Sequence, residues 1–381
     1  MARKVNPDTQ KLAMSALIES GIAAIAKDGI DQISVQSISD GAKNSRPTFY
    51  SYFGDINGLL AEIWLAKADY WLELVSNPET SPAAMNLQDK ALNRTITEIL
   101  AASHRIPEVE ELVQPKIASW WAKYKHEPKI VQLKVIWLLA ERIGVTITDP
   151  VDPMVHQAEF IEAALKMIPD SYPELPKAIR KEELPAVSEP EVSGESLDTK
   201  LLQSAIAVIA SSGVKSASMA RVARKAQVST GAVYPRFSKV DSLVESAFGE
   251  AVNEVIKQNF GLLGGTNFTA EDFGSFVLAG LLPERQVWRN FRVEIHLGAR
   301  TRPALAARMA ENLKETNAQV STKLTAFPIP YLTKGPIPYL VHAVGIGLAI
   351  LQNAGLPVGS IDHRQISKAI TEVINAANSA K

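Results

Sequence analysis

An internal repeat constrains the fold of this chain more than any other feature of its sequence. A shift of 184 residues, the separation of Tyr50 from Tyr234, aligns the surrounding stretches without a gap. The other identical pairs include Gly29 and Gly213, Ala42 and Ala226, Ser45 and Ser229, Phe53 and Phe237, and Leu59 and Leu243. Because a match of this length and spacing indicates a shared fold, we expect two copies of one structural unit.

The repeat continues downstream with growing offsets. Arg105–Val109 resembles Thr301–Leu305, and Trp137–Ala140 resembles Gly347–Ile350, so the second copy carries insertions. Between the copies, residues 169–199 hold five prolines among Glu, Ser and Lys. Prolines interrupt helices, and this polar mixture lacks the apolar residues that form a core, so the segment is predicted to be a linker.

Composition narrows the class of protein. The chain has 381 residues, more than the roughly 250–300 that one core usually supports. It has no cysteine, which excludes a disulfide framework and fits a reducing, cytoplasmic location. It also lacks a run of about 18 apolar residues, so no membrane span is expected. The net charge of −1, averaged over the whole chain, argues against a nucleic-acid partner.

The start of each copy predicts three helices, and the whole chain reads as all-α. Apolar residues between Ile18 and Ile25 share one helical face, and Gly29 supplies a left-handed stop. Ser34 and Ser45 are placed to cap two short helices joined by a tight turn, which is the helix-turn-helix arrangement. The corresponding serines of the second copy are Ser218 and Ser229.

The second of these short helices is the candidate DNA reader. Arg46 suits bidentate bonding to guanine, while hydroxyl groups suit phosphates, and Gly231 suits a close approach of the backbone to DNA. The candidate DNA-binding residues are Ser34, Lys43, Ser45, Arg46, Pro47, Thr48, Tyr50 and Tyr52 in the first copy, and Ser218, Arg221, Arg224, Lys225, Ser229, Thr230, Gly231, Tyr234, Arg236 and Lys239 in the second.

Two stretches carry a specific resemblance. Arg46–Phe53 and Val222–Phe237 resemble the DNA-binding domain of the TetR family of bacterial transcriptional regulators. The resemblance implies that an all-α ligand and dimerisation domain follows each helix-turn-helix, and that a small molecule releases a repressor from double-stranded operator DNA. The chain departs from the family at Ile56 and Val240, where a phosphate-contacting lysine is usual; Lys239 lies beside the second of these positions.

Local charge differs between the two predicted DNA-binding units, which are the two heads of the chain. Over residues 200–245, seven Lys or Arg face two Asp or Glu, which gives +5. Over residues 1–62, six basic residues face seven acidic ones, which gives −1. The neutral chain therefore contains one basic head, and we hypothesise that the two heads bind unequal half-sites of an imperfect palindrome.

The later helices are predicted to form the effector pocket and the dimer interface. Wide aromatic side chains inside a helical bundle can line an apolar pocket, although ordinary core packing is the simpler interpretation of each. The candidates are Trp120, Trp121, Tyr124, Trp137, Trp288, Phe291 and His296.

Two runs, 130–143 and 339–351, are too apolar for exposed helices, and the second is rich in glycine and alanine. By the family resemblance they form a dimer interface. Either the two copies pair within one chain as a pseudo-dimer, or two chains form a homodimer with four heads.

The predicted domains follow the repeat. They are residues 1–62 and 200–245 for the DNA-binding units, 63–168 and 246–381 for the ligand and dimerisation units, and 169–199 for the linker. The six histidines show no metal-ligand spacing, and no phosphate loop or nucleophile elbow is present, so no metal or cofactor is expected. A protein–protein adaptor with weakened DNA binding, or an all-α enzyme with an apolar substrate, remains as an alternative.

Overall fold

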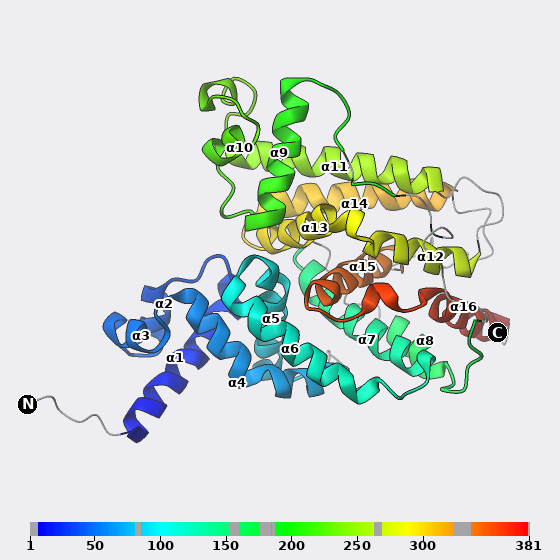
Figure 1. The fold of residues 1–381 in the computed structure, drawn as a ribbon, viewed down its shortest axis with the longest axis horizontal. Coiled ribbons are helices and arrows are strands. Elements are labelled where there is room, and N and C mark those ends of the chain that lie inside the picture. Colours follow the sequence, from blue (N-terminus) through cyan, green and yellow to red (C-terminus); the bar gives the residue numbers. More distant parts are fainter. Residues whose placement is uncertain are drawn as a thin grey trace, which may run out of the picture. The chain divides into compact units, whose positions relative to one another are not determined.

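The computed structural model describes most of the chain, and its regular secondary structure there is entirely helical (Figure 1). The described residues are 7–80, 85–151, 160–175, 184, 187–189, 191–262, 269–323 and 337–379. Within these ranges there are sixteen α-helices and no strands, so the all-α prediction is confirmed. The chain divides into two compact units, Met1–Trp120 and Trp121–Lys381. No helix of the described residues is long and apolar enough to cross a membrane.

The first compact unit begins with the first predicted head. Its helices are α1 (Pro7–Asp28), α2 (Val35–Gly41), α3 (Arg46–Phe53), α4 (Ile56–Ser76), α5 (Leu87–Ala102) and α6 (Pro107–Trp121). Helix α1 packs against α2, α4 and α5. The buried Glu98 carboxylate on α5 accepts the Ile30 backbone N–H at 2.8 Å, and the Thr95 hydroxyl donates to the Ile22 carbonyl at 3.0 Å. These bonds hold the head on α5.

The second unit contains the late helices of the first copy and all of the second copy. Its helices are α7 (Lys129–Thr148), α8 (Phe160–Met167), α9 (Leu197–Ser212), α10 (Met219–Lys225), α11 (Val240–Leu262), α12 (Ala270–Leu281), α13 (Gln286–Ala299), α14 (Pro303–Lys323), α15 (Ile337–Asn353) and α16 (His363–Ser379). Helix α9 packs against α10, α11 and α13, as α1 packs against its neighbours. Residues 197–199, predicted as the end of the linker, form the first turn of α9; residues 176–183, 185, 186 and 190 of the linker lie outside the described residues.

The two apolar runs lie on α7 and α15, which pack against one another. Their contact depends on a glycine from each copy. A Cβ added to Gly144 would lie 1.8 Å from the Ala343 carbonyl oxygen, and one added to Gly347 would lie 1.9 Å from that of Ala140. No side chain fits in either space, so each glycine allows close approach of a helix from the other copy.

A hydrogen bond also joins the two copies inside this unit. The indole N–H of Trp137 on α7 donates to Nδ1 of His363 on α16 at 2.9 Å, and the imidazole is fully buried. Helix α16 further packs against α7 and α8. The late helices of the two copies therefore pair within one chain, as the pseudo-dimer prediction requires.

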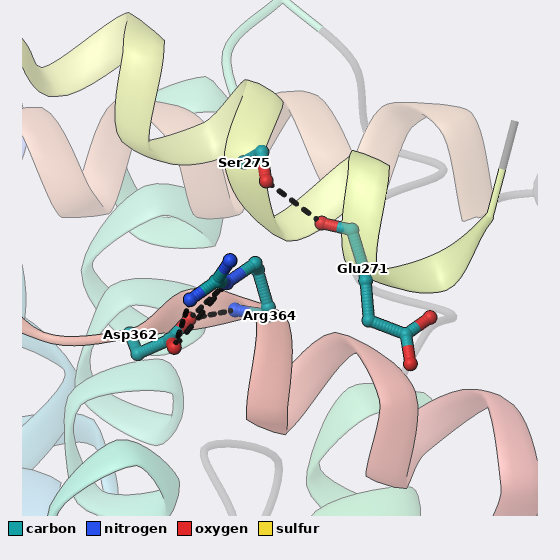
Figure 2. Close-up of polar contacts among 4 residues, drawn as sticks. All are labelled: Glu271, Ser275, Asp362 and Arg364. Atoms are coloured by element: carbon teal, nitrogen blue, oxygen red, sulfur yellow. Dashed lines mark hydrogen bonds and ion pairs between the residues drawn. The ribbon is translucent and has the colours of Figure 1, made fainter. Parts of the chain in front are cut away.

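Helix α12 covers the beginning of α16 (Figure 2). The Arg364 guanidinium forms an ion pair with Asp362 at 2.8 Å, and the Arg364 backbone N–H donates to the same carboxylate at 3.0 Å. A Cβ added to Gly274 of α12 would lie 2.4 Å from the Arg364 Cα atom. Backbone therefore packs on backbone here, and the first turn of α16 is fixed directly next to His363.

Candidate nucleic-acid interface

Short-range capping builds the helix-turn-helix of the first head. The Ser34 side chain accepts the Ser37 N–H at 3.1 Å, and Ser45 accepts the Thr48 N–H at 3.2 Å. Phe49 and Phe53 of α3 point into the core and are almost completely buried. Arg46 and Tyr50 are both exposed: Arg46 is the first residue of α3, and Tyr50 lies about 100° around the helix from Phe49.

The turn between the two short helices has the same backbone in both heads. Lys43 and Gln227, which the repeat aligns, both adopt a left-handed conformation, with φ of 53° and 59°. The following residues, Asn44 and Val228, donate equivalent backbone hydrogen bonds at 2.9 and 3.0 Å. The turn is therefore a shared structural element, although neither left-handed residue is a glycine.

The third element of the second head differs from the prediction. Only Thr230–Ala232 is helical, as a 3₁₀ turn, and Ser229 makes no capping bond through its side chain. The physical reason is the position of a proline in each segment. Pro47 lies in the first turn of α3, where a backbone N–H has no helical partner and is not needed. Pro235 lies further along, where a helix that continued from Ser229 would need a backbone N–H as a hydrogen-bond donor. Val233 is nevertheless buried, so the segment stays anchored.

None of the eighteen candidate DNA-binding residues is buried. Partly exposed residues are Thr48, Tyr52, Ser218 and Thr230. Exposed residues are Ser34, Lys43, Ser45, Arg46, Pro47, Tyr50, Arg221, Arg224, Lys225, Ser229, Gly231, Tyr234, Arg236 and Lys239. Tyr50 and Tyr234, at matched positions, are 53% and 57% exposed, which is unusual for tyrosines that only pack.

The two heads place their charges at different positions. Where the second head has Arg224 and Lys239, the repeat gives the first head Asp40 and Asp55. Asp55 caps α4 by accepting the Gly58 N–H at 2.9 Å. Conversely, Arg46 corresponds to Thr230. The first head therefore carries Lys43 and Arg46 just before and at the start of its candidate reading helix, and the second carries cations around its candidate reading segment.

The cations of the second head are not equally available. Arg236 forms an ion pair with Asp198, and the Arg221 guanidinium donates to the Ser216 carbonyl at 3.1 Å. Arg224, Lys225 and Lys239 form no ion pair within the described residues. These three are accordingly the most available of the candidate cations of the second head.

The candidate effector residues do not form one group. Trp120 and Trp121 are buried on α6, and the Trp121 ring lies 5.5 Å from that of Tyr124. Trp137, on α7 of the first copy, donates its hydrogen bond to His363 of the second copy. Another group lies on α13, where the Trp288 and Phe291 rings are 6.0 Å apart and His296 is buried one turn further along.

The structure adds two residues to the α13 group that sequence reasoning missed. The Arg292 guanidinium lies 5.7 Å from the Trp288 ring centroid, and its Nη2 atom is 3.3 Å from Nδ1 of His342 on α15. A sequence signal exists for Arg292, because Arg289, Arg292 and His296 recur at helical spacing. No such signal links α13 to His342, since that contact depends on packing.

Comparison with known families supports the assignment of both heads. Residues 17–63 and residues 201–247 each match the family model described as bacterial regulatory proteins, tetR family. The two matches begin 184 residues apart, which is the separation of the internal repeat. Among curated proteins, none matches the chain significantly.

Proposed function

Because this is a tandem TetR-family chain with the DNA-binding domain present twice, we propose that one chain does the work of a dimeric repressor. The observation that carries the proposal is the α7–α15 contact, in which Gly144 and Gly347 each receive the other copy. Both partners of a dimerisation surface are thus supplied by one polypeptide. No catalytic step is part of this function.

The two heads have unequal tasks in this proposal. The first contributes base recognition through Arg46, and the second contributes phosphate binding through Arg224, Lys225 and Lys239. Successive major grooves lie about 34–36 Å apart on one face of DNA, which sets the expected half-site spacing. Unlike heads require an imperfect palindrome, in contrast to the operator of two identical subunits.

The two ligand and dimerisation units, residues 63–168 (the first body) and 246–381 (the second body), respond to a small apolar or aromatic effector. Its binding changes the separation or angle of the heads and weakens operator binding, with a coupling free energy of about 1–3 kcal/mol. The match of both heads to the tetR family model supports the proposal of repression released by an effector.

Mapping of genomic binding sites, followed by light scattering of the free chain and its operator complex, tests the proposal. We expect an asymmetric two-part motif and one chain on each short operator. Two chains on one operator would overturn the single-chain pseudo-dimer. Absent or salt-insensitive operator binding would instead favour the adaptor function.

A further inference from the structure

A buried cationic face runs along α13 in the second body. Arg285 precedes the helix, and Arg289, Arg292 and His296 follow at spacings of four, three and four residues, so the four side chains share one face. Arg285 and Arg289 are 3% and 5% exposed, and the Nε atom of each has no hydrogen-bond partner among the described residues. Arg292 keeps part of its surface accessible.

Hydrogen bonds around Arg292 fix the protonation of two histidines. His296 Nδ1 lies 2.7 Å from the Arg292 carbonyl oxygen, so this nitrogen carries the proton and donates. Its Nε2 is then an acceptor, 3.3 Å from His342 Nε2, which therefore donates. His342 Nδ1 is left to accept from the Arg292 guanidinium at 3.3 Å. Both imidazoles are neutral in this closed ring.

The charge of Arg292 consequently has no anion to balance it. Within the described residues Arg292 forms no ion pair with a carboxylate. Burial, together with the charge of Arg285, lowers the pKa of Arg292 to about 10, so the side chain is still protonated at neutral pH. Burial and the Arg292 charge keep the pKa of His296 at about 4 and that of His342 well below its ordinary value. A partly buried cation with no anion beside it destabilises a folded protein unless something pairs with it.

A carboxylate of the linker occupies the neighbouring position. The two carboxylate oxygens of Glu189 accept the backbone N–H groups of Val287 and Trp288 at 2.8 and 3.0 Å. The negative charge of the Glu189 carboxylate attracts the guanidinium groups of Arg285 and Arg289. This face of α13 thus already holds one carboxylate in its first turn, while Arg292 lies one turn further along.

The first copy shows that the fold does not need these polar residues. Applying the offset of 196 residues that relates Arg105 to Thr301 places Arg292 on Ile96 and His296 on Leu100. Both of these aliphatic side chains are fully buried in α5. The same helix is thus built with an ordinary apolar core in one copy and with a cation and an imidazole in the other.

We propose that Arg292, positioned by His342 and His296, binds the carboxylate of an aromatic effector whose ring lies against Trp288, an assignment that rests on the effector response proposed above. Arg292 supplies charge-assisted hydrogen bonds to the carboxylate. The neutral histidines hold the guanidinium in place without competing for it. Only the second copy carries this site, so each chain binds one effector.

Binding of 1-naphthoate and its neutral amide, 1-naphthamide, to the full chain at equal ionic strength tests the assignment by calorimetry and thermal shift. We expect the carboxylate to bind at least about tenfold more tightly than the amide, because a hydrogen bond to a charged group is lost with the amide. Arg292→Gln should abolish this preference, whereas Arg308→Gln, which removes an exposed arginine paired with Glu311 on α14, should retain it.

Two further measurements separate a binding role from a structural one. Free Arg292→Gln protein should melt at the same temperature as the wild type or higher, because it removes an unbalanced, partly buried charge. A lower melting temperature, or equal binding of carboxylate and amide by the wild type, overturns the assignment. Operator binding in the absence of any effector reports on the proposed function separately; if it persists while the carboxylate preference is missing, only the effector class is wrong.

Discussion

The two heads share a backbone and differ in their surface chemistry. Lys43 and Gln227 adopt the same left-handed conformation in equivalent turns, and Ser34 and Ser218 cap the equivalent helices α2 and α10. The exposed positions have diverged, with Asp40 in the first head where Arg224 stands in the second. A helix-turn-helix is therefore specified by its caps, turn and buried side, which leaves its outer side free to acquire a different role in each copy.

The two bodies show the same division inside the core. Ile96 of α5 and Arg292 of α13 occupy matched positions, and the carboxylates of Glu98 and Glu294 on the same helices are both buried. A polar group has been built into one copy at a position that the other fills with an aliphatic side chain. This difference, like that of the heads, separates what the fold requires from what a function adds.

Lowering the pH should produce the largest difference in stability between the two compact units. Burial lowers the pKa of His296 and of His363 to about 4, compared with about 6.5 in an unfolded chain. Between these values the unfolded state binds more protons, so the free energy of unfolding falls as pH drops from about 6.5 to 4, by about 1.4 kcal/mol per pH unit for each histidine. Hydrogen exchange at pH 7 and pH 5 should show α13 and α16 losing more protection than α1 to α5.

The variant His363→Gln isolates the contribution of His363 to the pH dependence of unfolding. Its side-chain oxygen can still accept the Trp137 indole N–H, but it does not titrate. We expect the pH dependence of unfolding to flatten by about 1.4 kcal/mol per pH unit. An unchanged slope would contradict the assignment of acid sensitivity to His363.

Closing the glycine contacts should test whether the unlike heads work as one unit. Gly347→Ala brings a methyl group within 1.9 Å of the Ala140 carbonyl oxygen, and we expect a loss of about 1–3 kcal/mol in stability together with weaker operator binding. Gly144→Ala should behave alike. Gly280→Ala on α12 is the matched control, since an added Cβ meets nothing within 4 Å; it should be neutral or stabilising.

Removing the cation of the first reading helix should break the difference in base recognition. Arg46 is exposed, so Arg46→Ala should leave thermal stability unchanged while reducing discrimination at one half-site by about 1–3 kcal/mol. Thr230→Ala at the matched position should have a smaller effect, because threonine makes no bidentate contact. Selection of binding sites from random DNA measures both; an unchanged motif for Arg46→Ala would refute the role of this residue.

The smallest predicted effect concerns phosphate binding. Asp40→Arg gives the first head the charge of Arg224, and each added phosphate contact should steepen the slope of log affinity against log salt by about 0.9. Arg224→Ala should flatten the slope by a similar amount. Operator binding from 50 to 200 mM salt measures the change, with Arg308→Gln as the control; equal slopes for all variants would show that neither position meets DNA.

Much of each head could be predicted because the relevant interactions are short-range. Ser34, Ser45 and Ser218 cap helices at the expected places. The prediction for Ser229 was wrong in that the following segment is a 3₁₀ turn, because the effect of Pro235 six residues later outweighs the capping preference. Exposure of Tyr50 and Tyr234 could not be read from the repeat, since a tyrosine suits either a core or a surface.

The amino-acid sequence by itself determined the repeat, the all-α class and the caps at Ser34, Ser45 and Ser218, because these depend on neighbouring residues and helical periodicity. The tertiary structure alone decided that Gly144 and Gly347 face the other copy, and that Trp137 meets His363. It also brought Arg292 to His342, 50 residues away along the chain. Such contacts follow from which helices pack and at what depth, and no local pattern encodes that choice.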